Sequence, residues 1–490
     1  MAAKAAGDGV FNMKLTQALQ SGHYVDREVV QRILKFLDFG VFFVAAAFIL
    51  LKSALPPVAE NAAVTAGFLA AEIGLLCVFV LRTIGFYGVG ALTGGLLAAL
   101  RAAVVTFLAG AILFAITNLA VFPLDGHWIP SWALFTATYV LITRQTLSLW
   151  ASPIARTGGF RKRVAIVGGG KAAEDALKAL ENSNGLDIDI AGLFDDRDDA
   201  RSPASIMKHH KIGKIGELAD YARQQRIDLI IVAIPLSAEA RLLHILKRLW
   251  ELPVDIRISG QASALKLGPR AYTYLGRLPL LAVFDRPLNG WSMFLKSTVD
   301  RVIAALAIIL LSPVMIAVAL AVRVESAGPI IFRQRRYGFN NELIEVYKFR
   351  SMFTNLTDAN AAKLVSKGDP RVTKVGRIIR RTSLDELPQL FNVLTGQLSL
   401  VGPRPHATQA KAAEALYEQV VDGYFARHKV KPGITGWAQV NGWRGETDTR
   451  EKIEQRVKHD LEYIDQWSLG LDLLILAKTP FALLKSENAY

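Results

Sequence analysis

Four long runs of apolar residues precede residue 150, and one further run of similar length lies near 302–322. The early runs cover 36–55, 62–81, 98–122 and 131–150. Each is close to the roughly 20 helical residues that the hydrocarbon core of a bilayer requires. The pattern predicts a four-helix transmembrane bundle over 36–150. It is preceded by an N-terminal segment, 1–35, which lacks the features of a cleaved signal peptide.

Positive charge flanks both ends of the predicted bundle, at Lys14, Arg27, Arg32, Lys35, Arg156, Arg161, Lys162 and Arg163. Segments rich in lysine and arginine stay in the cytoplasm. Both ends of the bundle, and the soluble domains that follow, are therefore expected on the cytoplasmic side.

From residue 163 short β-branched runs alternate with amphipathic segments. Strands are predicted from 163, at 189–197, 228–235 and 254–259, with helices after the first strand and at 217–225 and 238–250. This alternation is typical of a parallel doubly wound sheet. The sequence therefore predicts an α/β Rossmann-like domain over 151–285.

A glycine-rich turn follows the first of these strands. Gly168, Gly170 and Ala173 fit the loose G-x-G-x-x-A form of the dinucleotide fingerprint. Asp195 comes later than the ~20 residues at which the ribose-binding acid usually follows, and no redox pattern such as Tyr-x-x-x-Lys is present. The preferred interpretation is a domain without a cofactor, in which Gly168 and Gly170 are a weak candidate site for an unidentified nucleotide.

The later apolar run carries Ser312 and Pro313 at its middle. Proline inside a helix removes a hydrogen bond and bends the helix. Arginines and lysines lie on both sides of the run, which favours two flanks on one face of the membrane. We expect a re-entrant helix hairpin over about 296–323, with an ordinary kinked span as the alternative.

Charge is distributed unevenly along the 490 residues. The formal net charge is +14, and 323–381 holds 13 Lys and Arg against 5 Asp and Glu. This stretch follows the membrane-inserted run and lacks an RNA-binding signature, so anionic lipids are expected as partners rather than nucleic acid. The lone cysteine, Cys77, excludes a disulfide framework within one chain.

Asp385 and Glu386 are adjacent carboxylates in a strongly basic context. Such a pair suits a divalent metal and a phosphorylated substrate: one carboxylate can attack phosphorus while the other holds Mg²⁺. The alternative is structural, because Ser383 and Glu386 have the spacing of a helix capping box. Lys348 and Arg350, in YKFRSM, are expected to place two cations on one face of a strand.

The segments KFRSM, DELPQLFNV, LSLVGPRP and PGITGWAQVNG, together with the Ser-Pro break, occur in the order typical of one family. The whole chain resembles the polyprenyl-phosphate hexose-1-phosphate transferases, the large monotopic phosphoglycosyl transferases of bacteria. The resemblance implies a catalytic domain over 286–490 that is anchored in the inner (cytoplasmic) membrane. It also implies transfer of hexose 1-phosphate from a UDP-sugar to undecaprenyl phosphate, with release of UMP.

The same resemblance assigns roles to individual residues. It implies that Asp385 is the nucleophile that forms a phosphosugar-aspartyl intermediate and that Glu386 is the Mg²⁺ ligand. It further implies that Arg380 and Arg404 bind phosphate. Lys348 and Arg350 would belong to a basic motif beside them, and Ser312 and Pro313 to the helix break.

The donor sugar is predicted from the stretch WRGETDT, which resembles the glucose-transferring branch of the family. Glu446, Thr447 and Asp448 could hydrogen-bond sugar hydroxyls, although this loop could also only dock the C-terminal helix. We expect UDP-glucose as donor, UDP-galactose as the alternative, and initiation of an exopolysaccharide or capsule repeat unit.

Two other functions stay open at this stage. One is a membrane-tethered NAD-dependent sugar-nucleotide oxidoreductase built on Gly168, Gly170 and Asp195, and the other is a non-catalytic membrane scaffold. The C-terminal stretch with Asp472 and Lys478 is expected to form an interfacial helix. The sequence does not determine the oligomeric state, and a homodimer is compatible with it.

Overall fold

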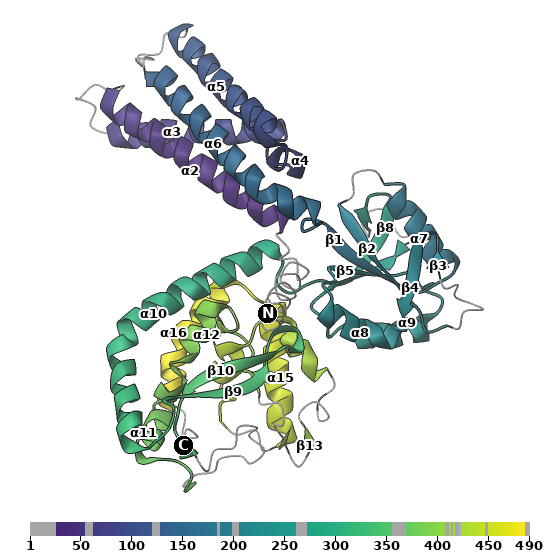
Figure 1. Cartoon of the computed structure of the whole chain (residues 1–490), viewed down its shortest axis with the longest axis vertical. Helices are drawn as coiled ribbons and strands as arrows, with labels where there is room; N and C mark the ends of the chain where they lie inside the picture. The colour runs from purple at the N-terminus through teal and green to yellow at the C-terminus, as the bar shows by residue number, and fades with distance from the viewer. Residues whose placement is uncertain are drawn as a thin grey trace, which may run out of the picture. The chain divides into compact units, whose positions relative to one another are not determined.

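The chain forms two compact units, Met1–Arg161 and Lys162–Tyr490 (Figure 1). The computed structural model describes residues 26–53, 62–119, 128–183, 187–197, 205–260, 272–354, 369–406, 411–412, 415–416, 421, 423–445 and 449–485. The first unit is longer than the predicted bundle, because its last helix continues beyond residue 150.

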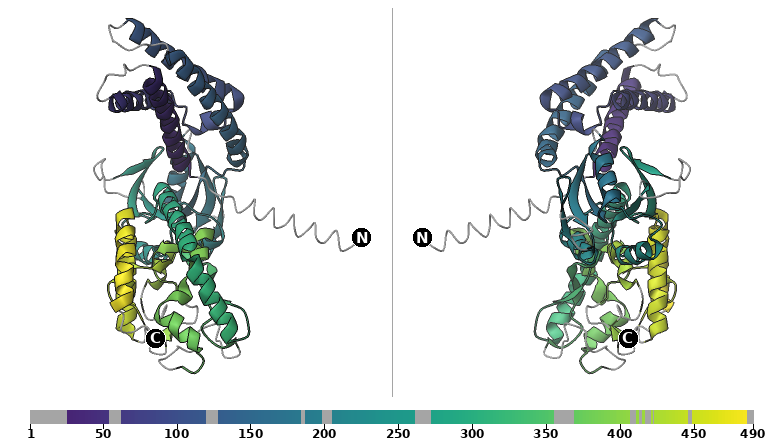
Figure 2. Two further views of the ribbon diagram at one scale, coloured as in Figure 1. Left: turned by 90° about the vertical axis from the view of Figure 1, so that its left-hand side faces the viewer. Right: turned by 90° about the vertical axis from the view of Figure 1, so that its right-hand side faces the viewer.

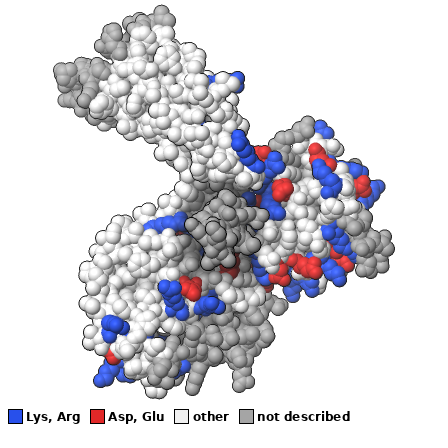
Figure 3. Space-filling model, in the orientation of Figure 1, with Lys and Arg blue, Asp and Glu red and all other residues white. Residues whose placement is uncertain are grey.

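The first unit is helical, and its helices are α2 (Arg27–Ser53), α3 (Ala62–Thr83), α4 (Val89–Leu92), α5 (Gly95–Leu119) and α6 (Ile129–Arg156). Helix α2 packs against α3, and α5 against α6. Phe42, Leu50, Leu81 and Trp132 fill the interior. Many large apolar side chains point outward, and the surface of this unit is almost free of charge (Figure 3). An apolar exterior of this kind is that of a membrane-embedded bundle.

Among the described helices, α2, α3, α5 and the later α10 are long and apolar enough to cross a membrane. They make the chain a membrane protein. The fourth predicted span, 131–150, is helical as part of α6, but α6 does not reach the same hydropathy. The helix expected over 131–150 is therefore present, but it is not among the described helices that are apolar enough to count as candidate spans.

A buried ion pair explains part of the polarity of α6. Arg144 places Nη2 2.5 Å from Oδ2 of Asp38 on α2, and both side chains are shielded from solvent. The hydroxyl of Tyr87 donates to the same oxygen at 2.7 Å. Charges inside an apolar bundle are stable only when paired, so α6 carries an arginine that α2 neutralises.

The second unit begins with an eight-stranded sheet in the order β3-β4-β2-β1-β5-β6-β8-β7. The strands are β1 (Lys162–Val167), β2 (Ile188–Phe194), β3 (Ser205–Ile206), β4 (His209–Gly213), β5 (Leu229–Val232), β6 (Asp255–Ser259), β7 (Thr273–Leu275) and β8 (Leu278–Phe284). The helices are α7 (Lys171–Glu181), α8 (Ile215–Gln224) and α9 (Glu239–Leu249). The predicted strand–helix alternation is present.

The sheet is mixed rather than wholly parallel. Strands β4, β2, β1, β5 and β6 run parallel, whereas β3, β8 and β7 add antiparallel edges. Alternation with helices did not predict these edge strands. The hairpin of β7 and β8 turns at Gly276, whose φ of 60° suits a tight two-residue loop.

Helix α10 (Gly290–Glu325) is one 36-residue helix that bends over the edge of the C-terminal domain, which was predicted over 286–490 (Figure 1). Pro313 lacks the N–H that would donate to the carbonyl of Ile309, four residues earlier. The hydroxyl of Ser312 donates to that carbonyl instead, at 2.9 Å. The Ser-Pro pair therefore permits a bend while the exposed backbone acceptor stays bonded. The described structure is a continuous bent helix, not two separate helices.

The C-terminal domain continues with β9 (Ile331–Tyr337), η4 (Phe339–Asn341), β10 (Leu343–Phe349), α11 (Lys374–Arg381), η6 (Leu384–Glu386), α12 (Gln389–Thr395), β11 (Ser399–Val401), β12 (Lys411–Ala412) and β13 (Ala415–Leu416). It ends with η7 (Tyr424–Lys429), β14 (Gly433–Thr435), α14 (Trp437–Val440), α15 (Arg450–Asp465) and α16 (Leu469–Lys485). Val346, Val393, Val401 and Ile475 belong to its core. The side views show α16, in yellow, at the edge of this domain (Figure 2).

Both ends of α10 are bonded to this one domain. Near its start, Lys296 pairs with Asp472 of α16 at 2.7 Å, and Asp300 accepts from the hydroxyl of Ser399 at 2.6 Å. At its end, the carboxylate of Glu325 accepts from the backbone N–H of Val375 at 3.0 Å. Asp472 is thus a buried structural residue, and only part of α16 presents an apolar face.

Candidate active site

The two predicted acidic residues lie at a sharp turn between α11 and α12. Ser383 adopts the left-handed conformation, with φ of 58°, immediately before η6. Its hydroxyl accepts from Nη2 of Arg444 at 2.5 Å and makes no cap to the backbone of η6. The predicted capping box is therefore wrong. A non-glycine residue in this conformation is uncommon and often marks a functional turn.

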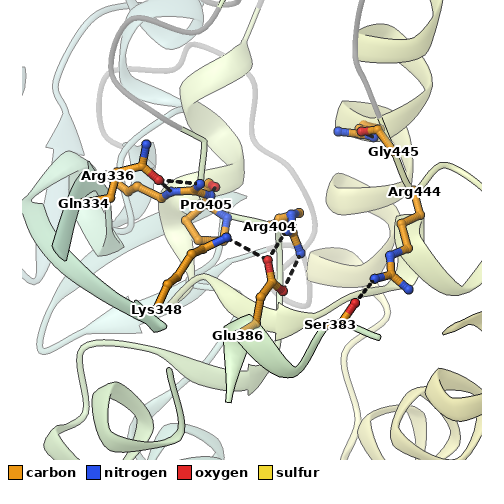
Figure 4. Close-up of polar contacts among 10 residues, drawn as sticks. Gln334, Arg336, Lys348, Ser383, Glu386, Arg404, Pro405, Arg444 and Gly445 are labelled. Atoms are coloured by element: carbon orange, nitrogen blue, oxygen red, sulfur yellow. Dashed lines mark hydrogen bonds and ion pairs between the residues drawn. The ribbon is translucent and has the colours of Figure 1, made fainter. Parts of the chain in front are cut away.

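Glu386 is held by two cations (Figure 4). Nζ of Lys348 lies 2.8 Å from Oε1 of Glu386, and Nη2 of Arg404 lies 2.6 Å from the same oxygen. Nη1 of Arg404 reaches Oε2 at 3.3 Å. Burial opposes ionisation of Glu386, but Arg404 and Lys348 outweigh it and hold the pKa well below its ordinary value. Glu386 is therefore a carboxylate at neutral pH.

Asp385 has a different electrostatic environment although it is the neighbouring residue. Burial, reinforced by the charge of Glu386, raises the pKa of Asp385 to about 6, against the opposing influence of Lys348, Arg380 and Arg404. Adjacent carboxylates whose pKa values are moved apart are typical of sites in which the two groups have different roles. Arg380 contributes charge here and is half-buried at the end of α11.

Strands β9 and β10 supply a second cation that the sequence analysis did not single out. The antiparallel register pairs Lys348 with Phe332 and Val346 with Gln334, so Lys348, Gln334 and Arg336 share one face. Arg336 donates to Oε1 of Gln334 at 2.8 Å and to the carbonyl of Pro405. Burial and the nearby Arg404 lower the pKa of Arg336 to about 10. In the sequence, the alternation of residues in FRQRRY was the signal that could have placed Arg336 on this face of the strand.

Asn392 fixes β10 against α12. Its side chain is fully buried, its Nδ2 donates to the carbonyl of Glu345 at 2.7 Å, and its Oδ1 accepts from the N–H of Tyr347 at 3.0 Å. Buried amides that satisfy backbone groups on another element set the register of that element. Asn392 thereby sets the position of Lys348 relative to Glu386.

Arg404 stands in the loop after β11, which pairs with β14. The two backbones approach so closely that a Cβ on Gly433 would lie 2.1 Å from the nitrogen of Gly402. Nη2 of Arg427 donates to the carbonyl of Arg404 at 2.8 Å. Asp460, in turn, neutralises Arg427 at 2.5 Å. Buried groups behind the loop thus determine where the Arg404 guanidinium points.

Arg350 does not join this site, in contrast to the prediction. Strand β10 ends at Phe349, so the alternation that would align Arg350 with Lys348 is lost. Its guanidinium is buried and donates to the carbonyls of Ser326 and Pro329, both at 2.6 Å, just beyond the end of α10. Arg350 is a structural residue that binds free carbonyls, a favourable role for a cation near a helix C-terminus.

The predicted sugar-recognition residues Glu446 and Asp448, with Thr447, lie outside the described residues. Gly445, which directly precedes them, is described, and its carbonyl accepts from Nη2 of Arg456 at 2.6 Å.

The glycine-rich turn after β1 of the eight-stranded sheet is partly occupied by a side chain. Gly168 and Gly170 have φ of 113° and 77°, so the tight turn is present. Asp195 is buried and paired with Arg197 at 2.9 Å and Arg241 at 3.0 Å, and Arg197 also donates to the carbonyl of Gly169 at 2.6 Å. This arrangement does not fit a dinucleotide whose ribose is bound by Asp195.

The donor set at Asp385 and Glu386 fits Mg²⁺ with help from a substrate. Among the described residues no group of three or more His, Cys, Asp or Glu side chains is arranged for a metal. Mg²⁺ commonly takes one or two carboxylates and completes its shell with phosphates and water. From the described residues, Oε2 of Glu386 accepts one long bond, from Arg404, which leaves acceptor capacity on that oxygen.

Two known families match parts of the chain. Residues 291–486 match the family described as bacterial sugar transferase, and 84–260 match a family described as CoA-binding domain. The chain is 38% identical over 360 residues to a UDP-glucose:undecaprenyl-phosphate glucose-1-phosphate transferase of Escherichia coli K12, covering 74% of this chain and 76% of the relative.

Relatives with other donors are also similar. An undecaprenyl-phosphate galactose phosphotransferase of Salmonella typhimurium is 31% identical over 77% of this chain and 80% of its own. A UDP-N-acetylgalactosamine-undecaprenyl-phosphate N-acetylgalactosaminephosphotransferase of Aeromonas hydrophila is 45% identical over 38% of this chain and 43% of its own. With matches of this extent, in a domain that brings the family's motifs together around one acid pair, the chain belongs to the bacterial sugar transferase family.

Proposed function

We propose that this protein transfers glucose 1-phosphate from UDP-glucose to undecaprenyl phosphate, releases UMP and so initiates an exopolysaccharide or capsule repeat unit. The single observation that carries the proposal is the acid pair in its cage of cations. Asp385 is a nucleophile whose pKa lies near 6, and Glu386 is ionised between Lys348 and Arg404.

The reaction proceeds in two displacements at one phosphorus. A carboxylate oxygen of Asp385 attacks the β-phosphorus of UDP-glucose, and the bond from that phosphorus to the bridging oxygen breaks, so UMP leaves with the electron pair. A phosphate oxygen of undecaprenyl phosphate then attacks the same phosphorus. The bond to Asp385 breaks, the carboxylate is regenerated, and the lipid carries a diphosphate-linked glucose.

The surrounding residues neutralise and orient charge during both steps. Lys348 and Arg404 are held on Glu386 and carry positive charge close to Asp385. Arg380 and Arg336 add further positive charge near the acid pair. Mg²⁺, when held by Glu386 and the diphosphate, would neutralise the charge that develops on the leaving UMP.

The attachment of α10 supports a re-entrant topology. A helix of 36 residues is ~54 Å long if straight, far more than a bilayer core of ~30 Å. Yet Asp472 and Ser399 bind its first half, while Val375 and Arg350 bind its last turn and the residues just after it. Two ends bonded to one domain lie on one side of a membrane. The cytoplasmic face of the bacterial inner membrane is the side that we propose for this domain, because lysines and arginines flank the helix.

The donor assignment rests on relatives and on the stretch after PGITGWAQVNG. The glucose-transferring relative is more similar over most of the chain than the galactose-transferring one. The N-acetylgalactosamine relative matches over only 38% of this chain. UDP-galactose is therefore the alternative donor, and the reaction itself does not depend on this choice.

The decisive experiment measures UMP from the purified full-length protein with Mg²⁺. Incubation with UDP-glucose alone is expected to release UMP in a burst equal to the enzyme present, because the first displacement needs no lipid. Asp385→Asn should abolish the burst while the protein keeps its melting temperature. UMP that appears only after undecaprenyl phosphate is added would refute the covalent intermediate. A panel with UDP-galactose and UDP-N-acetylgalactosamine tests the donor, and equal use of either would refute glucose specificity.

A further inference from the structure

Two cations lie side by side where α10 passes the end of α12. Helix α12 ends at Thr395, and Gly396 follows it with φ of 82°. A Cβ on Gly396 would lie 2.8 Å from Nη2 of Arg301 and 3.4 Å from Nζ of Lys431. Because glycine has no side chain, it leaves room beside both positively charged groups.

Neither cation is paired with a carboxylate of the described residues. Arg301 donates through Nη1 to the hydroxyl of Ser297 at 2.7 Å and through Nε to the carbonyl of Leu394 at 3.3 Å. The two nitrogens beside Gly396, Nη2 of Arg301 and Nζ of Lys431, donate to none of the described groups. Both therefore keep donors for a further acceptor.

The charge around Lys431 favours an anion as that acceptor. Burial lowers the pKa of Lys431, and the charge of Arg301 lowers it further. Asp300 opposes this shift, but its carboxylate already lies 3.6 Å from Nζ of Lys296 and accepts from the hydroxyl of Ser399 at 2.6 Å. Two like charges held side by side repel, whereas an anion bound by both is attracted to each.

The same stretch of α10 is where the helix enters the apolar layer in the proposed topology. Immediately after Arg301 the helix exposes large apolar side chains, among them Val302 and Leu306, with 53% and 62% of their surfaces accessible. Two to three turns earlier, the rings of Trp291 and Phe294 stack with their centroids 5.6 Å apart. Aromatic side chains gather at membrane interfaces, so the two cations stand at the level of the lipid headgroups.

From these observations we infer that Arg301 and Lys431 bind the headgroup phosphate of an anionic phospholipid, the commonest anion at a membrane surface. The inference rests on the proposed placement of α10 in the membrane and not on the transfer reaction. The acid pair precedes α12 whereas this site follows it, and a helix of seven residues is about 10 Å long. A phosphate beside Gly396 is too far from Asp385 to react, so the lipid bound here is not the acceptor.

The test follows the melting temperature of the purified full-length protein in a neutral detergent as phosphatidylglycerol is added. The wild type should be stabilised in a saturable way, because a ligand that binds only the folded state raises its stability. Lys431→Met should weaken the apparent Kd for phosphatidylglycerol about 10-fold, the loss expected for one hydrogen bond to a charged group. Without lipid its melting temperature should not fall, since this lysine has no bonded partner to lose. Lys458→Met, at an exposed position on α15, is the matched control and should respond as the wild type does.

A second variant, Lys431→Glu, sets a carboxylate beside Arg301 in place of the lipid phosphate. It should raise the melting temperature without lipid and abolish the response to phosphatidylglycerol. A response of the same size and midpoint in the wild type and both variants would overturn the inference. Undecaprenyl phosphate that competes with phosphatidylglycerol through Lys431 would make this an acceptor site, and inorganic phosphate that stabilises the wild type equally well would make the ligand a free ion; either result would overturn the assignment to a phospholipid. Release of UMP is measured on the same samples, so a failure of the proposed reaction is seen separately.

Discussion

Replacing Lys348 with methionine tests how the acid pair is tuned. Lys348 is the strongest influence that opposes the raised pKa of Asp385, which stands at about 6. With that pKa, Asp385 is about 90% ionised at pH 7 and about 10% ionised at pH 5. Methionine keeps the length of the side chain but removes its charge.

The size of the effect follows from the loss of one nearby cation. An opposite charge at 4–6 Å lowers a carboxyl pKa by about 1–3, so Lys348→Met should raise the pKa of Asp385 to about 7–9. The ionised fraction at pH 7 then falls to between about 50% and about 1%. The UMP burst rate from UDP-glucose should therefore drop about 2- to 100-fold at pH 7 and recover as the pH approaches 9.

The assay is the rate of the UMP burst without lipid acceptor, measured between pH 5 and pH 9. In the wild type this rate should rise with pH, reach half its maximum near pH 6 and level off above about 7, since only the carboxylate attacks. Lys374→Met, at the exposed start of α11, is the control and should leave the profile unchanged. A loss that is the same at every pH would mean that Lys348 acts only by contacting substrate phosphate, and the reasoning would be refuted.

Three further predictions concern the scaffold. Asp472→Ala removes the nearer carboxylate from the buried Lys296, which keeps only Asp300 at 3.6 Å, and it removes the acceptor of the Tyr463 hydroxyl; it should lower the free energy of unfolding by about 3–5 kcal/mol in urea titrations, whereas the exposed Asp465→Ala should change it by less than about 0.5 kcal/mol. Arg350→Met should lower the melting temperature but leave the KM for UDP-glucose within about twofold. A raised KM would mean that Arg350 contacts the substrate, as the sequence analysis predicted. Cysteines at 290 and 340, introduced after Cys77 is replaced, should both be protected from an impermeant thiol reagent outside intact cells, and labelling of one alone would indicate a complete span.

Motifs and hydropathy predicted the parts of the molecule that depend on local sequence. The apolar runs became α2, α3, α5 and α10 because hydropathy over about 20 residues is a local property. Asp385, Glu386, Lys348 and Arg404, by contrast, were assigned through motifs whose residues are far apart in the chain. Lys348 and Arg404 both bind the carboxylate of Glu386, which agrees with those motifs. Neither the composition nor the periodicity of the chain would have placed these residues together.

What the sequence could not distinguish was one arginine from another in a basic region. Arg336 and Arg350 stand in the same positively charged stretch, yet one lies beside the acid pair and the other binds carbonyls after α10. The difference arises from where β10 ends, a boundary that alternation alone does not specify. Arg444 was missed for a similar reason, because its partner Ser383 lies 61 residues away.

The bend of α10 connects the fold to the proposed reaction. Its exposed residues include Leu306, Ile309, Leu310, Leu320 and Val324, and burying each such side chain contributes about 1.5–3 kcal/mol. Together these five favour lipid by roughly 7–15 kcal/mol, enough to keep the helix in the membrane. Because both ends of the same helix are bonded to the catalytic domain, that domain cannot leave the membrane surface without extracting the helix. With the proposed topology, a lipid phosphate that diffuses in the bilayer and a soluble nucleotide sugar can reach the same acid pair.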